Sequence, residues 1–365
     1  MPSVLGKLLR AKRYGVKIER SLHHIPMDVQ ILKDTVQALM APGKGLIAMD
    51  ESTPTSDKRF KEVGIPTTEE MRRIYREWIA TTPHLGDSIS GAILYDETIH
   101  QKTDDGTSFV EVLNRAGIVP GIKVDEGAHD LAGFNDERVT DGLDGLRDRL
   151  KEYAAMGARF AKWRAVITIG DGIPTDACIE ANAEALARYA ALCQEAGIVP
   201  IVEPETLMEG DHTLEQCEAV TEKVLRAVFA RLALHKVALE GTILKPNMVV
   251  PGEKSPTQNS VEEVADATVR CFLRTVPAAL GGVAFLSGGQ SAQLASARLN
   301  AMHVRHDKEL PWPLTFSFSR AIQQPALEYW AGKPENVERA QQILLHRAQL
   351  NSAARRGEYS EAMEN

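Results

Sequence analysis

FAKWRAV at residues 160–166 and VPIVEPE at residues 199–205 decide the fold, because each reads as a short β-strand rich in β-branched or aromatic residues. Both carry charged side chains two positions apart, which places each pair of charges on one face of its strand. Further β-rich segments recur along the chain at residues 45–50, 91–97, 121–125, 242–248, 282–289 and 312–319. The sequence therefore predicts eight strands.

Helical segments separate the predicted strands, because apolar residues between them recur with a period of 3.6 residues. Examples are Leu143, Leu146, Leu150 and Tyr153, and Leu214, Cys217, Val220, Val224 and Val228. Three pairs have the spacing of an N-terminal capping box, namely Thr67 with Glu70, Thr213 with Gln216, and Ser260 with Glu263. Gly157 and Gly197 end helices just before the next strand.

Strict alternation of strand and helix predicts a parallel sheet, and eight repeats predict closure into a (β/α)8 barrel, the TIM-barrel fold. We expect one barrel domain over residues 1–365, with extra helices at about residues 29–40 and from Pro334 to about Ala354, and a polar tail at 357–365. An open Rossmann-like sheet is the alternative. It is disfavoured because no G-x-G-x-x-G motif follows any predicted strand.

The composition is that of a globular protein with a large aliphatic core, since 44% of the 365 residues are hydrophobic and 25% are charged. The formal net charge of -8 disfavours nucleic acid as a partner, although local basic groups can still bind small anions. No apolar stretch is long enough to span a bilayer. We therefore expect small-molecule partners and neither a nucleic acid nor a membrane.

The location of the protein is predicted from its cysteines and its first residues. Four widely spaced cysteines without a Cys-x-x-Cys motif favour a reducing compartment, so we expect a cytoplasmic protein. Residues 1–21 form a basic extension with the charge bias of a transit peptide but few serines. Import into an organelle is the minor alternative to a solvated extension.

Charged residues gather at the carboxyl ends of the predicted strands, where barrel enzymes place their chemistry. Taken singly, a lysine or glutamate at a strand end is usually solvated. Projected together into one barrel mouth, these charges would each cost several kcal/mol to desolvate unless paired, which favours a catalytic cluster. The set consists of Asp50, Lys123, Lys162, Arg164, Glu203, Glu205 and Lys245.

Several lysines beside carboxylates suit Schiff-base chemistry. A lysine attacks a ketone as the free amine, and nearby cations together with partial burial favour that form. We therefore assign the imine to Lys245, with Lys162 and Arg164 as the neighbouring cations. Glu203 is the candidate acid for loss of water, Asp50 or Glu203 the candidate base for a substrate hydroxyl, and Glu205 is expected to hold the lysines in position.

Three groups of residues suit phosphate. The turn Ser287-Gly288-Gly289-Gln290-Ser291 opens a helix after the seventh strand, where backbone N–H groups and the helix dipole favour an anion. Ser317 and Arg320 at the end of the eighth strand add a hydroxyl and a guanidinium. Lys58 and Arg59 after the first strand could hold a second phosphate, or could form a solvated helix face.

At this point the sequence resembles class I fructose-bisphosphate aldolase, from about residue 29 to residue 357. The resemblance rests on long motifs in family order. These are Ala41-Pro42-Gly43-Lys44-Gly45, Asp50-Glu51-Ser52-Thr53, Lys162-Trp163-Arg164, Ile201-Val202-Glu203-Pro204-Glu205, Leu244-Lys245-Pro246-Asn247-Met248 and Leu286-Ser287-Gly288-Gly289-Gln290-Ser291.

The resemblance implies a homotetrameric enzyme that reversibly cleaves fructose 1,6-bisphosphate to dihydroxyacetone phosphate and glyceraldehyde 3-phosphate, in glycolysis and gluconeogenesis. It implies that Lys245 is the Schiff-base lysine and Glu203 the main acid/base residue, with Asp50 and Lys162 at the hydroxyls of the cleaved bond. By the same matching, Arg164 and Glu205 support the charge network. Ser287, Gly288 and Arg320 bind the ketone-side phosphate, and Ser52, Lys58, Arg59 and Lys123 line the sugar site.

Three other functions are less consistent with the sequence. A zinc-dependent aldolase would need grouped histidine ligands, whereas the ten histidines are scattered, so we expect no metal and no cofactor. A transaldolase or deoxyribose-phosphate aldolase would share the lysine but not the full set of motifs. A third alternative is a protein without catalytic activity that only binds other proteins. It is disfavoured because Lys245, Glu203 and Asp50 are all present.

The chain also departs from the family pattern. Pro54-Thr55 stands where members often have Gly-Ser, and proline removes a backbone donor near the second phosphate. Ser319 replaces a frequent glycine, which is harmless unless that position needs a positive φ. Many animal members end in a tyrosine that reaches back into the site, whereas the nearest tyrosine to this C-terminus is Tyr359.

Overall fold

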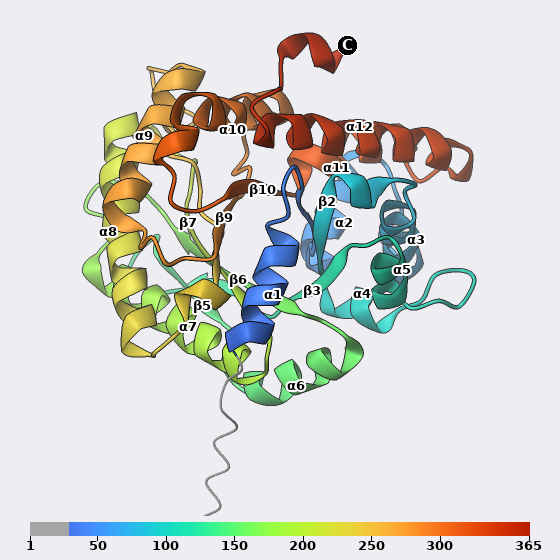
Figure 1. Ribbon diagram of the computed structural model, residues 1–365, viewed down its shortest axis with the longest axis horizontal. Helices are drawn as coiled ribbons and strands as arrows, with labels where there is room; N and C mark the ends of the chain where they lie inside the picture. Colours follow the sequence, from blue (N-terminus) through green and yellow to red (C-terminus); the bar gives the residue numbers. More distant parts are fainter. Residues whose placement is uncertain (1–28) are drawn as a thin grey trace, which may run out of the picture.

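Eight parallel strands close into a barrel in the order β1-β10-β9-β8-β7-β6-β3-β2 (Figure 1). The computed structural model describes residues 29–365, so the predicted basic extension at 1–21 lies outside the described residues. Closure confirms the (β/α)8 barrel and excludes the open sheet. The strands are β1 Gly45–Met49, β2 Ile89–Leu94, β3 Val119–Lys123, β6 Phe160–Ile167, β7 Val199–Thr206, β8 Ile243–Leu244, β9 Gly282–Phe285 and β10 Leu314–Phe318.

Helices surround the barrel, and most of them connect one strand to the next (Figure 1). The predicted capping boxes at Thr213 and Ser260 are confirmed, whereas the helix predicted to start from Thr67 is capped by Thr68, whose hydroxyl accepts from Met71 N–H. The helices are α1 Val29–Leu39, α2 Thr53–Glu62, α3 Glu69–Ala80, α4 Asp96–His100, α5 Phe109–Arg115, α6 Leu146–Met156, α7 Asp176–Glu195, α8 Leu214–Leu234, α9 Val261–Thr275, α10 Ala292–His306, α11 Arg320–Trp330 and α12 Val337–Arg355.

The two segments that predicted the fold form the longest strand pair of the barrel. β6 and β7 run side by side from Phe160 opposite Val199 to Ile167 opposite Thr206. Because side chains alternate along a strand, the charged residues two positions apart on each strand share the face that lines the barrel mouth. This pairing places two basic and two acidic side chains next to one another.

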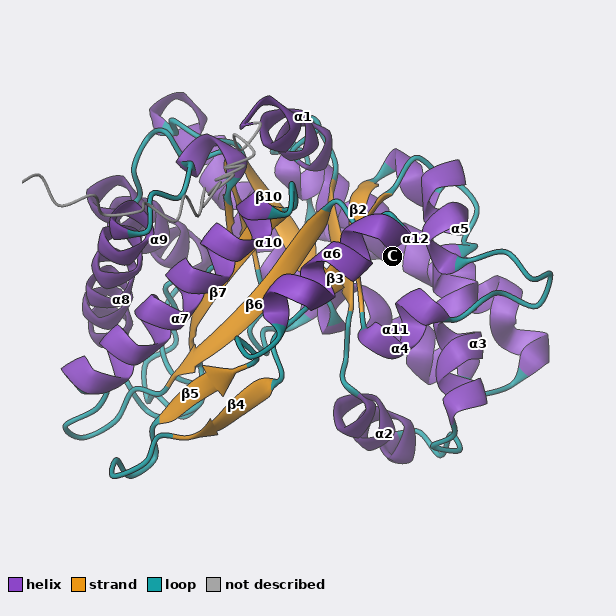
Figure 2. Cartoon of the chain, turned by 90° about the horizontal axis from the view of Figure 1, so that it is seen from below, coloured by secondary structure: helices purple, strands orange, loops and turns teal. Residues whose placement is uncertain are grey.

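An apolar plug fills the opposite end of the barrel. Leu32, Val36 and Leu39 of α1 pack against residues near the starts of strands, including Phe160 and Val199, and all of them are buried. Figure 2 shows α1 at this end and the loops that follow the strands at the other. The polar chemistry is therefore confined to the carboxyl ends of the strands, as the sequence predicts for a barrel enzyme.

Several strand boundaries differ from prediction, and three of these differences bear on the site. Glu97 was expected at the end of the second strand, but it lies in α4, where it pairs with Arg72 at 2.7 Å. The seventh strand, β9, ends at Phe285, so the Ser-Gly-Gly turn lies wholly outside it. The sixth strand, expected over 242–248, is Ile243–Leu244, although Lys245 N–H still donates to Val202 C=O at 2.8 Å and so continues the pairing.

Sequence reasoning missed an antiparallel hairpin of β4, Gly127–Asp130, and β5, Arg138–Asp141, which lies over the carboxyl end of β6 (Figure 2). Buried Glu137 anchors it by accepting from the N–H and hydroxyl of Thr175, both at 2.7 Å. The hairpin's strands are short and polar, so they lack the periodic apolar pattern that identifies a strand.

The polar tail predicted at 357–365 is docked onto the barrel helices. Tyr359 is 8% exposed, and its N–H donates to Asn300 of α10 at 2.9 Å. Glu364 pairs with Arg347 of α12 at 2.6 Å. The ordered tail is thus held by α10 and α12.

Substitution of Gly121 tests how tightly the apolar plug is packed. A Cβ at this position would fall 2.3 Å from two ring atoms of Phe160, so Gly121→Ala should lower the free energy of unfolding by about 1–3 kcal/mol. Combining it with Phe160→Leu should recover part of the loss, because the clash is removed. Urea unfolding of both single variants and the double variant measures this. A Gly121→Ala protein as stable as the parent would contradict the packing account.

Candidate active site

Two adjoining cavities open at the carboxyl ends of the strands, with volumes of about 670 Å³ and about 190 Å³. Their shared wall is charged, and the predicted strand-end residues form most of it. The smaller cavity reaches Lys245 and the Ser-Gly-Gly turn, and the larger reaches Lys123 and the β4–β5 hairpin. Both are lined by Asp50, Glu51, Thr55, Lys162 and Arg164.

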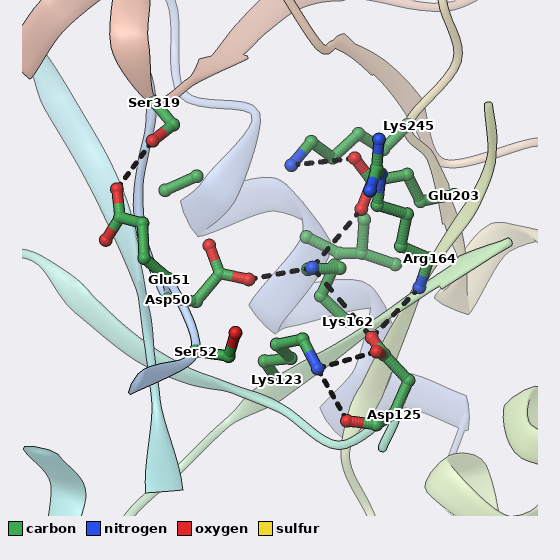
Figure 3. A network of polar contacts seen from close by, with 12 residues as sticks. Asp50, Glu51, Ser52, Lys123, Asp125, Lys162, Arg164, Glu203, Lys245 and Ser319 are labelled. Carbon is green, nitrogen blue, oxygen red and sulfur yellow. Dashed lines mark hydrogen bonds and ion pairs between the residues drawn. The ribbon is translucent and has the colours of Figure 1, made fainter. Parts of the chain in front are cut away.

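A chain of four alternating charges crosses this wall (Figure 3). Nζ of Lys245 lies 3.1 Å from Oε1 of Glu203, and Oε2 of Glu203 lies 3.4 Å from Nζ of Lys162. Nζ of Lys162 lies 2.7 Å from Oδ2 of Asp50. All four residues are at most 8% exposed. Strands β1, β6, β7 and β8 thus bring together residues that are far apart in the sequence.

Two neighbouring members of this chain, Lys162 and Asp50, carry fixed charges. Burial alone lowers the pKa of Lys162, but the carboxylates of Asp50, Glu203 and Asp125 outweigh burial and raise that pKa above its ordinary value. Burial alone raises the pKa of Asp50, but Lys162 and Lys245 outweigh it and lower that pKa. At neutral pH Lys162 is therefore a cation and Asp50 a carboxylate.

Glu205 and Arg164 form the neighbouring pair on the rim. Nε of Arg164 lies 2.5 Å from Oε2 of Glu205, whose side chain is 8% exposed, whereas the Arg164 side chain is 44% exposed. Both line the smaller cavity. The pair joins β6 to β7 just above the four-residue chain, so it holds the two strands in register at the site.

Asp125 is a site residue that sequence reasoning left without a role. It is 7% exposed, and its Oδ1 lies 2.6 Å from Nζ of Lys123. Its Oδ2 accepts from Arg164 N–H at 3.1 Å and lies 3.9 Å from Nζ of Lys162. Asp125 could have been found from the sequence because it is an acidic residue at the end of the third predicted strand. The same reasoning singled out Asp50 and Glu205.

The residues predicted for the ketone-side phosphate face one another across the smaller cavity. Ser287, Gly288, Ser317 and Arg320 line it together with Lys245. Oγ of Ser317 is buried without a hydrogen-bond partner among the described residues. Gly289 follows with a φ of 87° and lies against Arg320, whose Nη2 would be 3.7 Å from a Cβ there. The Ser317 hydroxyl, the Arg320 guanidinium and the N–H groups of the turn are the donors in this cavity that suit an anion.

The residues predicted for the sugar site are more dispersed. Ser52 lines the larger cavity, with its Oγ 3.1 Å from Oγ1 of Thr55, and Lys123 lines the same cavity. Lys58 is exposed and lines neither of these cavities. A contact of Lys58 with substrate would therefore need a substrate that reaches beyond both.

Arg59 lies in the wall of the smaller cavity but is already paired. It is 7% exposed, and its Nη1 lies 2.5 Å from Oε1 of Glu51. The same Glu51 oxygen accepts from the hydroxyl of Ser319 at 2.7 Å, while its Oε2 is buried without a hydrogen-bond partner (Figure 3). Ser319 has a φ of -104°, so serine fits there without strain. Glu51 is thus a second site residue that the sequence left without a role.

No cluster of three or more His, Cys, Asp or Glu side chains that could hold a metal ion occurs within residues 29–365. Over the same residues, no helix has the length and apolar character needed to cross a membrane. The four cysteines are buried free thiols. The described chemistry of the site is that of amines, carboxylates and hydroxyls.

Comparisons with known proteins agree with this geometry. A family model described as fructose-bisphosphate aldolase class-I matches residues 31–365. A Xanthomonas campestris pv. campestris protein named "Probable fructose-bisphosphate aldolase class 1" is 58% identical over 334 residues, covering 91% of this chain and 99% of the relative. A cytosolic fructose-bisphosphate aldolase of Arabidopsis thaliana is 53% identical, covering 87% and 81%.

A solved structure extends the similarity to the fold. Fructose-bisphosphate aldolase from Plasmodium falciparum superposes with a TM-score of 0.89 at 48% identity, covering 91% of this chain and 95% of that one. Its strands and helices therefore follow the same path over nearly the whole barrel. Sequence, site and fold together lead to one conclusion: the chain belongs to the class I fructose-bisphosphate aldolase family.

Proposed function

We propose that this class I fructose-bisphosphate aldolase uses Lys245 as its Schiff-base lysine in the reversible cleavage of fructose 1,6-bisphosphate to dihydroxyacetone phosphate and glyceraldehyde 3-phosphate. The observation that carries the assignment is the buried chain from Lys245 through Glu203 and Lys162 to Asp50. Glycolysis and gluconeogenesis are the pathways that use this reaction. The names of cytosolic Arabidopsis relatives support a cytoplasmic location, and we extend the proposal to the homotetramer implied by the family.

Glu203 serves the formation of the imine. A lysine attacks a ketone only after losing its proton, and Oε1 of Glu203, 3.1 Å from Nζ of Lys245, can accept that proton. After attack at C2, the same carboxyl group returns a proton to the carbinolamine oxygen, which leaves as water. The product is an iminium ion on Lys245.

Asp50 and Lys162 serve the cleavage step. The Asp50 carboxylate removes the proton from the C4 hydroxyl, and the electrons of the C3–C4 bond move into the iminium as the aldehyde leaves. Lys162, held cationic by its carboxylate neighbours, stabilises negative charge on the reacting oxygens. Protonation of the enamine at C3 and hydrolysis of the imine then release dihydroxyacetone phosphate and restore Lys245.

The two cavities account for the two phosphates. The smaller cavity binds the ketone-side phosphate through Ser287, Gly288, Ser317 and Arg320, because these donors lie beside Lys245. The larger cavity takes the aldehyde-side phosphate near Ser52 and Lys123. Pro54 lines the larger cavity, and its missing N–H weakens this second contact.

Lys245→Ala should abolish cleavage at every pH, because no other group supplies the electron sink. Steady-state assays with fructose 1,6-bisphosphate measure this, and Lys254→Ala at an exposed position is the matched control. EDTA should leave the activity of the unmodified enzyme unchanged. Appreciable turnover by Lys245→Ala would refute the assignment, and loss of activity in EDTA would instead favour a metal-dependent aldolase.

Lys162→Met should lower kcat/KM by about a thousandfold or more and should also destabilise the protein. Breaking this buried pair costs about 3–5 kcal/mol at neutral pH. The lowered pKa of Asp50 stabilises the fold above the ordinary carboxyl value of about 4, and the raised pKa of Lys162 stabilises it below the ordinary lysine value of about 10. Between these two pH values, the loss of unfolding free energy in Lys162→Met should therefore be greatest.

Urea unfolding of Lys162→Met and its parent across this range provides the measurement, with exposed Lys61→Met as the control. The difference in unfolding free energy should narrow as the pH falls through the lowered pKa of Asp50, because the parent then loses that contribution. A pH-independent difference would show that the pair does not carry the charges assigned to it.

Pro54→Gly should lower KM for fructose 1,6-bisphosphate by about tenfold if the restored N–H reaches the second phosphate, since a hydrogen bond to a charged group contributes about 1.5–3 kcal/mol. Fructose 1-phosphate lacks that phosphate and is the internal control, so its KM should not change. The parent enzyme should turn over the two substrates at comparable rates. Equal shifts for both substrates would place the effect of Pro54 elsewhere.

A further inference from the structure

Arg298, on the second turn of α10, is a buried cation without a carboxylate partner. It is 5% exposed, and its Nη1 donates a hydrogen bond to Oε1 of Gln290 at 2.7 Å. Its Nε has no hydrogen-bond partner among the described residues, and burial lowers its pKa. Leaving a buried charge uncompensated costs free energy, so this guanidinium needs an explanation.

The other buried arginines of the described chain are compensated. Four pair with a carboxylate, and a fifth, Arg355, donates to the backbone carbonyls of Met40 and Lys44. Arg298 and Arg355 both lack a carboxylate, but Arg355 donates to two backbone carbonyls, whereas Arg298 donates to one side-chain amide oxygen. The four pairs are Arg59 with Glu51, Arg72 with Glu97, Arg76 with Glu97, and Arg347 with Glu364.

Gln290 connects Arg298 to the turn that lines the smaller cavity. Because Oε1 of Gln290 accepts from Arg298, its Nε2 is left to donate to Ser287 C=O at 3.0 Å, and Gln290 N–H donates to the same carbonyl at 3.0 Å. The turn is thereby fixed with Gly288 at a φ of 58° and Gly289 at 87°. Arg298 thus determines which way the Gln290 amide faces.

The electrostatic potential is positive on the side of this turn that faces α10. Ser291 caps the N-terminus of α10, where the helix dipole is positive, and Arg298 lies on the next turn of the same helix. In front of the turn, Arg320 is exposed with no ion-pair partner among residues 29–365, and the buried Oγ of Ser317 has no hydrogen-bond partner there. No ion pair to Arg298 or Arg320 occurs within residues 29–365, so this part of the site has an excess of positive charge that suits an anion.

We infer that Arg298, acting through Gln290, is a positioning residue that sets the affinity of the Ser287–Ser291 turn for the phosphate of the ketone substrate. The inference rests on the proposed function of this turn as the ketone-side phosphate site. Bound phosphate offsets the uncompensated charge of Arg298, and the Gln290 amide keeps the turn in the conformation that receives it. Arg298 does not touch the reacting carbonyl, so its effect is confined to phosphorylated ligands.

Hydride trapping of the imine separates this role from catalysis, with dihydroxyacetone phosphate and unphosphorylated dihydroxyacetone as the two probes. Arg298→Met should raise the dihydroxyacetone phosphate concentration for half-maximal labelling about tenfold, equivalent to about 1.4 kcal/mol. The concentration for dihydroxyacetone should stay unchanged. Arg305→Met, on the same helix but exposed and paired with Asp266, is the matched control.

Two further variants separate positioning from folding. In Gln290→Glu the new carboxylate would pair with Arg298 and place negative charge on the α10 side of the turn, and its side chain could no longer donate to Ser287 C=O. Its loss of affinity should therefore exceed that of Arg298→Met. Arg298→Lys keeps the charge and should recover part of the affinity. Normal trapping of dihydroxyacetone by these variants would show that the Lys245 end of the site is intact.

Equal labelling of parent, Arg298→Met and Gln290→Glu by dihydroxyacetone phosphate would overturn the inference. So would equal losses with both probes, because a general disturbance of the site would then explain them. Absence of labelling in the parent would contradict the Schiff-base proposal instead. Calorimetric titration with inorganic phosphate would still decide the role of Arg298: weaker binding by Arg298→Met supports it, and unchanged binding overturns it.

Discussion

The structure depends on keeping four alternating charges buried side by side. Lys162 and Glu203 lie on β6 and β7, Asp50 and Lys245 directly follow β1 and β8, and each carboxylate lies within 3.4 Å of a lysine in the chain. Removing such charges from water is costly unless every partner is present, so the arrangement is stable only when the barrel is closed and in register. The same cluster holds Lys162 as a cation and Asp50 as a carboxylate, which are the charge states proposed for them in carbon–carbon cleavage.

The rest of the barrel supports this cluster because one end of the barrel is apolar and the other is polar. Apolar side chains of α1 seal the end where the strands begin, and Phe160 occupies the space left open by Gly121. The apolar packing at the end where the strands begin stabilises the barrel, so the polar end can contain cavities. Around the cluster, Arg164 with Glu205 and Arg59 with Glu51 bind neighbouring strands and loops together, and the Ser287–Ser291 turn, the proposed phosphate site, lines the same cavity as Lys245.

The fold and the centre of the site could be predicted from the sequence, because both depend on local patterns. Alternating strand and helix signals predict the barrel, and acids and lysines at strand ends identify Lys245 and Glu203. The sequence could not show contacts between distant residues, such as the Glu51 contacts with Arg59 and Ser319 or the lack of a carboxylate beside Arg298. The polar β4–β5 hairpin was missed for the related reason that Glu137 and Thr175 hold it through tertiary contacts.

The central claim is that the amine of Lys245 attacks the substrate ketone. Peptide mass mapping after treatment with dihydroxyacetone phosphate and borohydride tests it most directly. The account predicts a reduced adduct on the peptide that contains Lys245 and on no other lysine peptide of the barrel mouth. An unmodified Lys245 peptide, or an adduct on Lys123 or Lys162 instead, would contradict the assignment of the nucleophile.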